Sequence, residues 1–285
     1  MSDPLSHFYR NKEIFVKLPS KGHWYKQKPN LTDDFEIGIY PMSVKDEVLF
    51  KIPDTLYNGD AIFEVIKSIA PDIIDPYEIC LVDVDVLLIA SRINQNDGEM
   101  NVIAGCPHCK KTNEYGVDLE SILSQVKHIP TQPVELELQN GLRITFKPNT
   151  LASVNASHIM NTESVRIAAQ ITDDTDPAYA KELFRSSLEK TTGATIVVLA
   201  DAIENITTPD GTVVDNMESI TNWLSNTDSA TIEIIKKHSS VLNNAGMQKE
   251  FTFVCSNENC GESFEAPLEY NPAFFFTSNL DKHET

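Results

Sequence analysis

Four of the five cysteines in this chain stand in two close pairs, and their spacing is typical of metal ligands. Two residues separate Cys106 from Cys109, and four residues separate Cys255 from Cys260. Each pair follows an apolar, strand-like run and precedes a polar turn and a second strand-like run. Two such cysteine knuckles supply four thiolates, the ligand set of a closed tetrahedral zinc site. A closed site leaves no position for water, so we expect this zinc to be structural and not catalytic.

The two pairs lie far apart in the sequence, with 145 residues between Cys109 and Cys255. Closing a loop of that length costs roughly 4 to 5 kcal/mol. A structural zinc site contributes about 10 to 16 kcal/mol in small peptides, so the metal can offset the closure. We therefore expect residues 110–254 to be inserted between the two halves of one small zinc-ribbon-like unit.

Two other states of these cysteines remain open, namely two disulfides or thiols without metal. The chain begins Met1-Ser2-Asp3-Pro4, and no apolar leader segment follows. We expect a reducing compartment on this basis, which disfavours disulfides. His108, inside the first pair, is a candidate to replace a cysteine as ligand. Cys80 lies in an apolar run and is predicted to be a buried core residue.

Composition limits the classes of partner. The chain has 285 residues, a hydrophobic share of 41% and a net charge of −19, enough for one large domain or two modest ones. An acidic surface repels phosphate backbones, so we expect no nucleic-acid partner. No run approaches the roughly 20 apolar residues of a membrane span, so we expect no membrane partner either. The acidity serves solubility or attracts a basic partner, and both interpretations remain open.

Hydrophobic periodicity predicts an α+β fold. Strand patterns cover residues 13–18 and 35–40, and apolar residues at helical spacing follow two candidate N-caps, Asn58 and Asp83. Asn140-Gly141 stands between two alternating runs and predicts a hairpin with a tight primed turn, in which both residues have positive φ.

Residues 150–244 are predicted to be mainly helical. We expect helices to begin at Asp176-Pro177, Asp215 and Asp228, with an interruption at Thr192-Gly193 and a turn at Pro209-Asp210-Gly211.

The chain therefore divides into four predicted parts. They are an extended N-terminal arm (1–34), an α+β domain with the first knuckle (35–130), a hairpin plus helical insertion (131–249), and the second knuckle strands with a C-terminal tail (250–285). The arm is rich in aromatic residues, which either pack on the protein's own core or anchor the arm on a neighbouring subunit. These aromatics are Phe8, Tyr9, Phe15, Trp24 and Tyr25.

The motif content of the sequence favours a protein that is not an enzyme. The sequence contains no phosphate-binding glycine loop, no nucleophile elbow and no histidine pair at helical ligand spacing. Asp83 and Asp85 are interpreted as a cap and its first-turn neighbour. The acidic turn at Asp173, Asp174 and Asp176 is solvated charge or a weak cation site. We expect no small-molecule substrate, although a metal hydrolase that uses these acids is a third possible class.

Several longer motifs occur in a fixed order between residues 10 and 125. They are Phe15-Val16-Lys17-Leu18-Pro19-Ser20, Tyr40-Pro41-Met42-Ser43-Val44-Lys45-Asp46-Glu47, Pro53-Asp54-Thr55-Leu56-Tyr57-Asn58-Gly59, Ile66-Lys67-Ser68-Ile69-Ala70-Pro71-Asp72-Ile73, residues 83–93, and Cys106-Pro107-His108-Cys109 with Asn113-Glu114-Tyr115. This order resembles the baseplate hub assembly proteins of T-even-like contractile-tail bacteriophages. The second knuckle with Pro267-Leu268 and Phe274-Phe275-Phe276 resembles them more loosely, and the helical insertion does not.

The resemblance implies a non-enzymatic structural component of the contractile-tail baseplate hub that binds other phage baseplate and tail proteins. It also implies a place in the virion tail and, during assembly, in the host cytoplasm. The alternative is a transient, chaperone-like hub assembly factor that is absent from the mature virion. The wider spacing of Cys255 and Cys260 departs from the two-residue knuckle but stays within the range of zinc sites.

Overall fold

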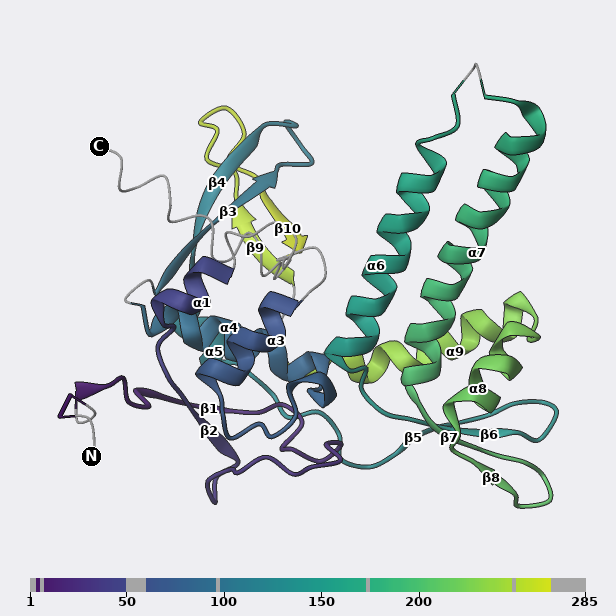
Figure 1. The fold of residues 1–285 in the computed structure, drawn as a ribbon. Coiled ribbons are helices and arrows are strands. Elements are labelled where there is room, and N and C mark those ends of the chain that lie inside the picture. Colours follow the sequence, from purple (N-terminus) through teal and green to yellow (C-terminus); the bar gives the residue numbers. More distant parts are fainter. Residues whose placement is uncertain are drawn as a thin grey trace.

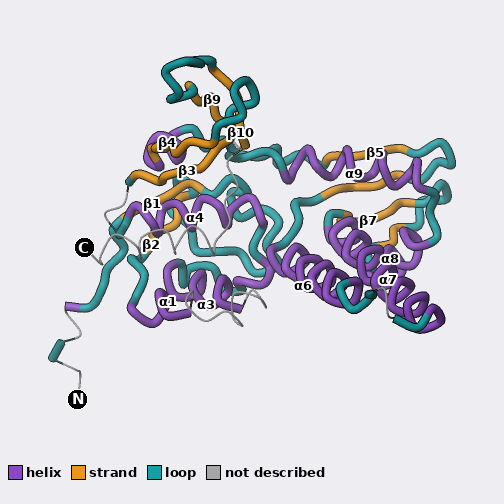
Figure 2. The backbone as a smooth tube through the Cα atoms, turned by 90° about the horizontal axis from the view of Figure 1, so that it is seen from above, coloured by secondary structure: helices purple, strands orange, loops and turns teal. Residues whose placement is uncertain are grey.

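The computed structural model describes residues 4–5, 8–49, 60–95, 98–172, 175–247 and 250–267. Helices and several small antiparallel sheets confirm the α+β prediction (Figures 1 and 2). Within the described residues, no helix has the length and apolarity to cross a membrane. Asn58, the Asp173-Asp174 pair and Phe274-Phe275-Phe276 lie outside the described residues.

The first lobe consists of the described residues within 8–130 and 245–267, and its core surrounds one helix. Its strands are β1 (Ile14–Lys17), β2 (Glu36–Ile39), β3 (Glu99–Gly105), β4 (Thr112–Asp118), β9 (Glu250–Val254) and β10 (Ser263–Pro267). Its helices are α1 (Val44–Leu49), α3 (Asp60–Ile69), the short 3-10 helix η2 (Pro76–Glu78), α4 (Leu81–Ile93) and α5 (Leu119–Ser124). Helix α4 is buried along most of its length, as expected for an apolar helix at the centre of a core.

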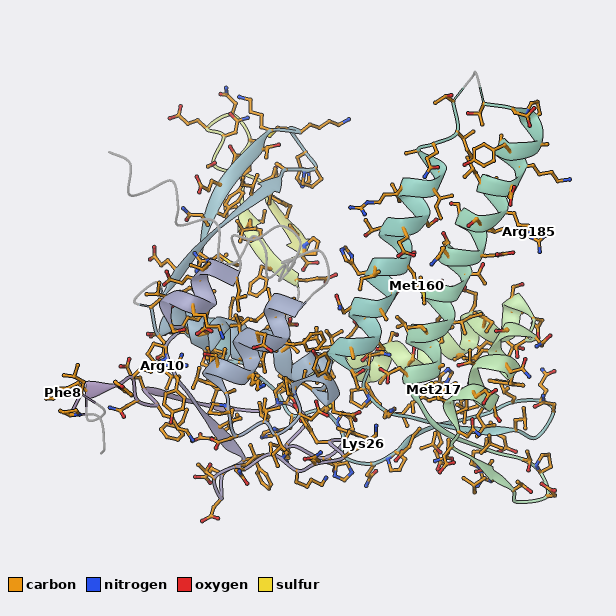
Figure 3. All side chains as sticks on the ribbon, viewed as in Figure 1. Phe8, Arg10, Lys26, Met160, Arg185 and Met217 are labelled. Carbon is orange, nitrogen blue, oxygen red and sulfur yellow. The ribbon has the colours of Figure 1, made fainter. Side chains whose placement is uncertain are left out.

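The aromatic residues of the N-terminal segment divide between the core and the surface. Strand β1 pairs with β2, and Tyr25 is buried in the first core. Trp24 is half-buried against that core. Phe8 is 84% exposed, and Figure 3 shows it beyond the edge of the lobe. Arg10 fixes the chain just after it by donating to the Pro41 carbonyl oxygen at 2.6 Å and to Ser68 Oγ at 2.7 Å.

Asp83 does not cap a helix, which corrects the sequence prediction. Helix α4 begins earlier, with Cys80 at the N-cap position, and leaves Asp83 fully buried in the first turn. Its carboxylate accepts hydrogen bonds from the Ser20 backbone N–H at 2.9 Å, the Tyr25 hydroxyl at 2.8 Å and the Ser20 hydroxyl. Burial raises the pKa of Asp83 to about 6, although these donors act in the opposite direction. Asp83 therefore binds the N-terminal segment to α4.

The second lobe, formed by the described residues within 131–244, has its own sheet and core. Strands β5 (Val134–Glu137), β6 (Arg143–Phe146), β7 (Ile203–Thr207) and β8 (Val213–Val214) form an antiparallel sheet in that order. Helices α6 (Leu151–Ala168) and α7 (Pro177–Asp201) form a long hairpin, followed by α8 (Met217–Ser225) and α9 (Ser229–Asn243). The sequence pattern did not predict β7 and β8 within the helical block. Strand β7 forms by pairing with β6, a partner about sixty residues away.

The helix starts in this lobe are partly as predicted. Asp176 and Asp228 cap α7 and α9, but Asn216 caps α8 in place of the predicted Asp215. Helix α7 continues through Gly193, where the sequence predicted an interruption. A Cβ added at Gly193 would lie 3.6 Å from Met160 Sδ on α6, so the glycine sits in the contact between the two helices.

The predicted β5–β6 hairpin is confirmed, but its turn differs from the prediction. Val134 pairs with Phe146 and Glu137 with Arg143. Only Gly141 has positive φ, at 81°, and its N–H donates to the Leu138 carbonyl oxygen at 2.9 Å. This arrangement matches the longer hairpin loop in which a turn is followed by one left-handed glycine.

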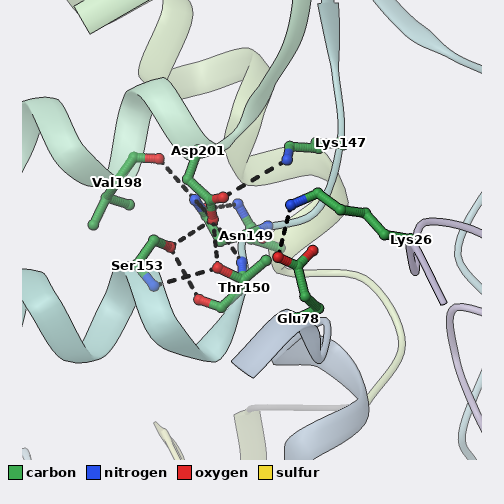
Figure 4. A network of polar contacts seen from close by, with 9 residues as sticks. Lys26, Glu78, Lys147, Asn149, Thr150, Ser153, Val198 and Asp201 are labelled. Atoms are coloured by element: carbon green, nitrogen blue, oxygen red, sulfur yellow. Dashed lines mark hydrogen bonds and ion pairs between the residues drawn. The ribbon is translucent and has the colours of Figure 1, made fainter. Parts of the chain in front are cut away.

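A buried carboxylate, Asp201, ends α7 next to the segment that joins the two lobes (Figure 4). Its Oδ2 accepts from the Thr150 backbone N–H at 2.7 Å, the Thr150 hydroxyl at 3.0 Å and Ser153 Oγ at 2.6 Å. Lys147 Nζ lies 3.7 Å from Oδ1. These donors all come from the segment that starts α6, so one carboxylate holds the beginning of α6 against the end of α7.

The same segment is bonded to both lobes. On the first-lobe side, Leu81 N–H donates to the Asn149 carbonyl oxygen at 2.8 Å, and Leu151 N–H donates to the Ile79 carbonyl oxygen at 3.0 Å. On the second-lobe side, Asn149 N–H donates to Asn243 Oδ1 at 2.8 Å, at the end of α9. The set of contacts around Asn149, Thr150 and Asp201 is called the joint below.

The buried Asp83 predicts a specific pH dependence of stability. Because the folded-state pKa of about 6 exceeds the ordinary value of 3.8, the native state holds this proton more tightly, and stability falls as pH rises through 6. Relative to Asp83→Asn, the wild-type protein is expected to lose about 1 kcal/mol of unfolding free energy between about pH 5 and about pH 7. Urea unfolding at the two pH values measures this, with the exposed Asp33→Asn as control. Equal pH dependence in wild type and Asp83→Asn would contradict it.

The joint predicts a large effect of Asp201→Ala. Removing the carboxylate leaves the half-buried Thr150 N–H without its acceptor and takes one of two acceptors from the buried Ser153 hydroxyl, so we expect a loss of about 1 to 3 kcal/mol of unfolding free energy. Chemical denaturation measures the loss. Glu204→Ala, an exposed carboxylate three residues further on, is the matched control and is expected to change stability by less than about 0.5 kcal/mol. Equal losses in the two variants would show that Asp201 has no structural role.

Candidate metal centre

Two antiparallel hairpins of the first lobe carry the cysteine pairs in their turns. Gly105 pairs with Thr112 at the end of β3–β4, and Val254 pairs with Ser263 at the end of β9–β10. Both views of the backbone show the hairpins side by side (Figures 1 and 2). The Tyr115 ring lies 4.8 Å from that of Phe253, between centroids, which joins the hairpins through an apolar contact. The layout of strand, cysteine pair and strand is thus as the sequence predicted.

The four thiols converge at these turns. The Sγ atoms of Cys106, Cys109, Cys255 and Cys260 all lie within 4.8 Å of one another. Cys109 Sγ is 3.6 Å from Cys255 Sγ, and Cys106 Sγ is 3.9 Å from Cys260 Sγ. A tetrahedral metal with four bonds of about 2.3 Å requires sulfur–sulfur distances of about 3.8 Å, so the geometry fits a tetrathiolate site. A disulfide needs about 2.05 Å, and all five cysteines are free.

The turns point backbone donors at the sulfurs. Lys110 and Gly261, each directly after the second cysteine of its pair, have positive φ of 61° and 62°. This conformation reverses the chain, and the Lys111 and Glu262 backbone N–H groups then bond to the sulfurs of the cysteines two residues earlier. Such donors around the ligands stabilise thiolates and are a usual part of metal centres.

Each thiol of the cluster changes the pKa of its neighbours, and the resulting repulsion between thiolates favours binding of a cation among them. The Lys111 backbone N–H, helped by the Asn257 side chain, lowers the pKa of Cys109 to about 6. The Asn257 backbone N–H lowers the pKa of Cys255. Burial and the neighbouring Cys109 and Cys106 thiols outweigh it and raise the pKa of Cys255 to about 11. The first thiolate to form therefore opposes ionisation of the others. A divalent cation removes this repulsion, and these four residues can hold a metal ion.

The other residues considered from the sequence lie elsewhere. His108 is exposed and stands outside the cluster of four sulfurs. Cys80 is 2% exposed in the first core, which confirms its prediction as a core residue. Sequence reasoning missed Asn113, whose Nδ2 lies 3.8 Å from Cys255 Sγ, and the Asn257 side chain near Cys109. Neither asparagine has a spacing signal that could have identified it.

Comparison with known proteins identifies one family. The sequence model of the family described as T4 bacteriophage base plate protein matches residues 11–276. No curated protein and no solved structure matches the chain. The matched range begins before β1 and ends after β10, so it includes both lobes, the joint and the four clustered cysteines.

The cluster predicts the metal content of cysteine variants. We expect about one metal ion per chain in the reduced wild-type protein and a clear loss in Cys106→Ser, because the fourth thiolate is gone. Elemental analysis of purified protein measures both. Cys80→Ala is the matched control: it lies outside the cluster, keeps the full metal content and loses about 1 kcal/mol of stability through packing. A metal-free wild type, or metal loss in Cys80→Ala, would contradict this ligand set.

Proposed function

The chain belongs to the family of T4 bacteriophage base plate proteins, and from this premise we propose that it is a non-enzymatic structural component of the contractile-tail baseplate hub. Its role there is to bind other baseplate and tail proteins. The observation that carries the proposal is the family match over residues 11–276, since it includes both lobes and not one small module. Membership of this family implies a structural role in the phage baseplate and a place in the virion tail.

Two connected cores are consistent with a structural part. The joint bonds the start of α6 to the first lobe through backbone hydrogen bonds of Leu81 and Leu151, and both lobes have their own hydrophobic core. Buried, fully satisfied polar networks make the relative position of two units specific.

Among the described residues, the one group of three or more potential metal-ligating side chains is the set of four cysteines.

We propose that the metal at the cysteine cluster is zinc and that its role is structural. Four thiolates with nearly tetrahedral spacing are a preferred donor set for zinc, and a closed set of four protein ligands leaves no position for a reacting water. Cys106, Cys109, Cys255 and Cys260 would hold the ion. When bound, the zinc would cross-link the β3–β4 hairpin to the β9–β10 hairpin. It would take part in no reaction. The two hairpins then form a zinc-ribbon-like unit, and the second lobe is inserted in the sequence between β4 and β9.

The second candidate is a transient assembly factor that helps to build the hub and then leaves the particle. Presence in the finished virion separates the two roles. We expect quantitative mass spectrometry of purified particles to find this protein at a fixed whole-number ratio to other baseplate proteins, because a structural component is built in at defined positions.

The same measurement includes its own controls. A baseplate protein and a capsid protein of the same particles calibrate the ratio, and lysate taken before purification shows that the protein was made. Absence from particles, combined with presence in lysate, would reject the structural role and favour the assembly factor.

A further inference from the structure

Each cysteine hairpin extends one asparagine side chain to a sulfur of the other hairpin. Asn113 on β4 places its Nδ2 3.8 Å from the Sγ of Cys255, in the β9–β10 turn. In the opposite direction, the side chain of Asn257, in the same β9–β10 turn, forms a hydrogen bond to the sulfur of Cys109, in the β3–β4 turn. Both contacts therefore cross between two hairpins that are far apart in the sequence.

The two sulfurs that receive these contacts lie side by side, with 3.6 Å between Cys109 Sγ and Cys255 Sγ. Four thiolates around a divalent cation leave an excess of negative charge on the sulfurs. Cys255 is 4% exposed, so water has little access to its sulfur, and donors of the protein must compensate that charge. A carboxamide suits this task, because its N–H groups donate and it carries no charge of its own.

Tyr115 holds the Asn113 amide in place. Its hydroxyl oxygen lies 3.4 Å from Asn113 Nδ2 and accepts a hydrogen bond, which leaves the other N–H of the amide for Cys255. The Tyr115 ring lies 4.8 Å from the ring of Phe253 and 5.9 Å from that of Phe264, between centroids, so it packs against both strands of the other hairpin. The donor to Cys255 is thus oriented by contacts that themselves join the hairpins.

The turn that follows β9 holds Asn257. Its carbonyl oxygen accepts from Cys260 N–H at 2.8 Å and from Gly261 N–H at 3.2 Å, and its own backbone N–H bonds to the sulfur of Cys255. These backbone contacts fix the residue from both sides, so its side chain has a defined position for Cys109 of the other hairpin. Replacing the side chain alone leaves the backbone bonds in place, which makes the amide separately testable.

We propose that Asn113 and Asn257 are positioning residues of the metal centre, whose amides donate across the hairpins and set the affinity of the four thiolates for their metal. Neither asparagine is a ligand. Each acts through the sulfur that it bonds, by orienting the thiolate and reducing its excess charge, and partners of this kind change metal affinity by about 10- to 100-fold. The inference rests on the proposed metal site, but it does not depend on which divalent metal the site holds.

The metal affinity of the full, reduced chain tests the proposal. We expect Asn113→Ala and Asn257→Ala each to raise the Kd for Zn²⁺ by about tenfold or more, measured by competition with a chromophoric chelator. Asn113→Asp keeps the shape of the side chain but turns a carboxylate toward the thiolate, so it is expected to weaken binding further than Asn113→Ala. Asn101→Ala and Asn259→Ala are the matched controls and are expected to keep the wild-type Kd. Both of these asparagines are exposed, one on the β3–β4 hairpin and one in the β9–β10 turn.

The absorption spectrum of the Co²⁺-loaded protein separates a donor to sulfur from a residue that only supports the fold. Loss of a hydrogen bond raises the energy of the sulfur electrons. The sulfur-to-cobalt charge-transfer band is therefore expected to shift to longer wavelength in Asn113→Ala and Asn257→Ala, and to stay in place in both controls.

The outcomes distinguish this inference from the metal site on which it rests. A wild-type protein that binds neither Zn²⁺ nor Co²⁺ would overturn both. A wild-type protein that binds metal, with variants that match the controls in Kd, would overturn only the role of the two asparagines. A higher Kd with an unshifted charge-transfer band would show that the asparagines support the fold without donating to sulfur, which also overturns the inference.

Discussion

The carboxylate of Asp201 fixes the start of α6, which is the segment through which the second lobe is bonded to the first. It ends α7, accepts hydrogen bonds from the start of α6 and lies beside Lys147, so it compensates several buried donors at once. Asn149 extends this joint to the end of α9 and, through its carbonyl oxygen, to Leu81 of the first lobe. Buried polar groups are stable only when they are paired, so the joint admits few alternative arrangements of the lobes.

The cysteine cluster imposes a second constraint of a different kind. The joint acts between helix termini through hydrogen bonds, whereas the cluster connects two hairpins that are 145 residues apart between Cys109 and Cys255. The second lobe lies between these hairpins in the sequence, so its two ends must return to the same part of the first lobe. A metal at the four thiols would secure that return, and the joint at Asn149 would set the orientation of what is inserted. The proposed structural role fits a chain with two such independent connections.

The α6–α7 hairpin of the second lobe exposes apolar side chains to solvent. The first lobe buries α4 at its centre, while the α6–α7 hairpin consists of two helices and exposes side chains of both. One face is occupied by ion-paired side chains such as Glu163 and Lys190, and the other exposes Phe184 and Leu188. Exposed apolar side chains of this kind are available for contacts with other proteins.

The sequence by itself determined the features that depend on neighbouring residues. The cysteine spacing located the cluster, alternating apolar residues located β1, β2 and the β5–β6 hairpin, and Asp176-Pro177 located the start of α7. The long ordered motifs of the first lobe pointed to the phage baseplate, and the family match over residues 11–276 confirms it. Each of these signals lies within a few residues of the structure it specifies, so local physical chemistry is sufficient to interpret it.

Only the tertiary structure decided the features that need a distant partner. Asp83 looked like a cap, but Ser20 and Tyr25 make it a buried acceptor instead. Gly193 looked like a break, but α6 packs against it and the helix continues. Strand β7 forms because β6 offers backbone partners, and Asp201 became the joint because the start of α6 folds back onto the end of α7. Burial and pairing across the chain outweigh local preference at such positions, since contacts between distant residues leave no trace in local spacing.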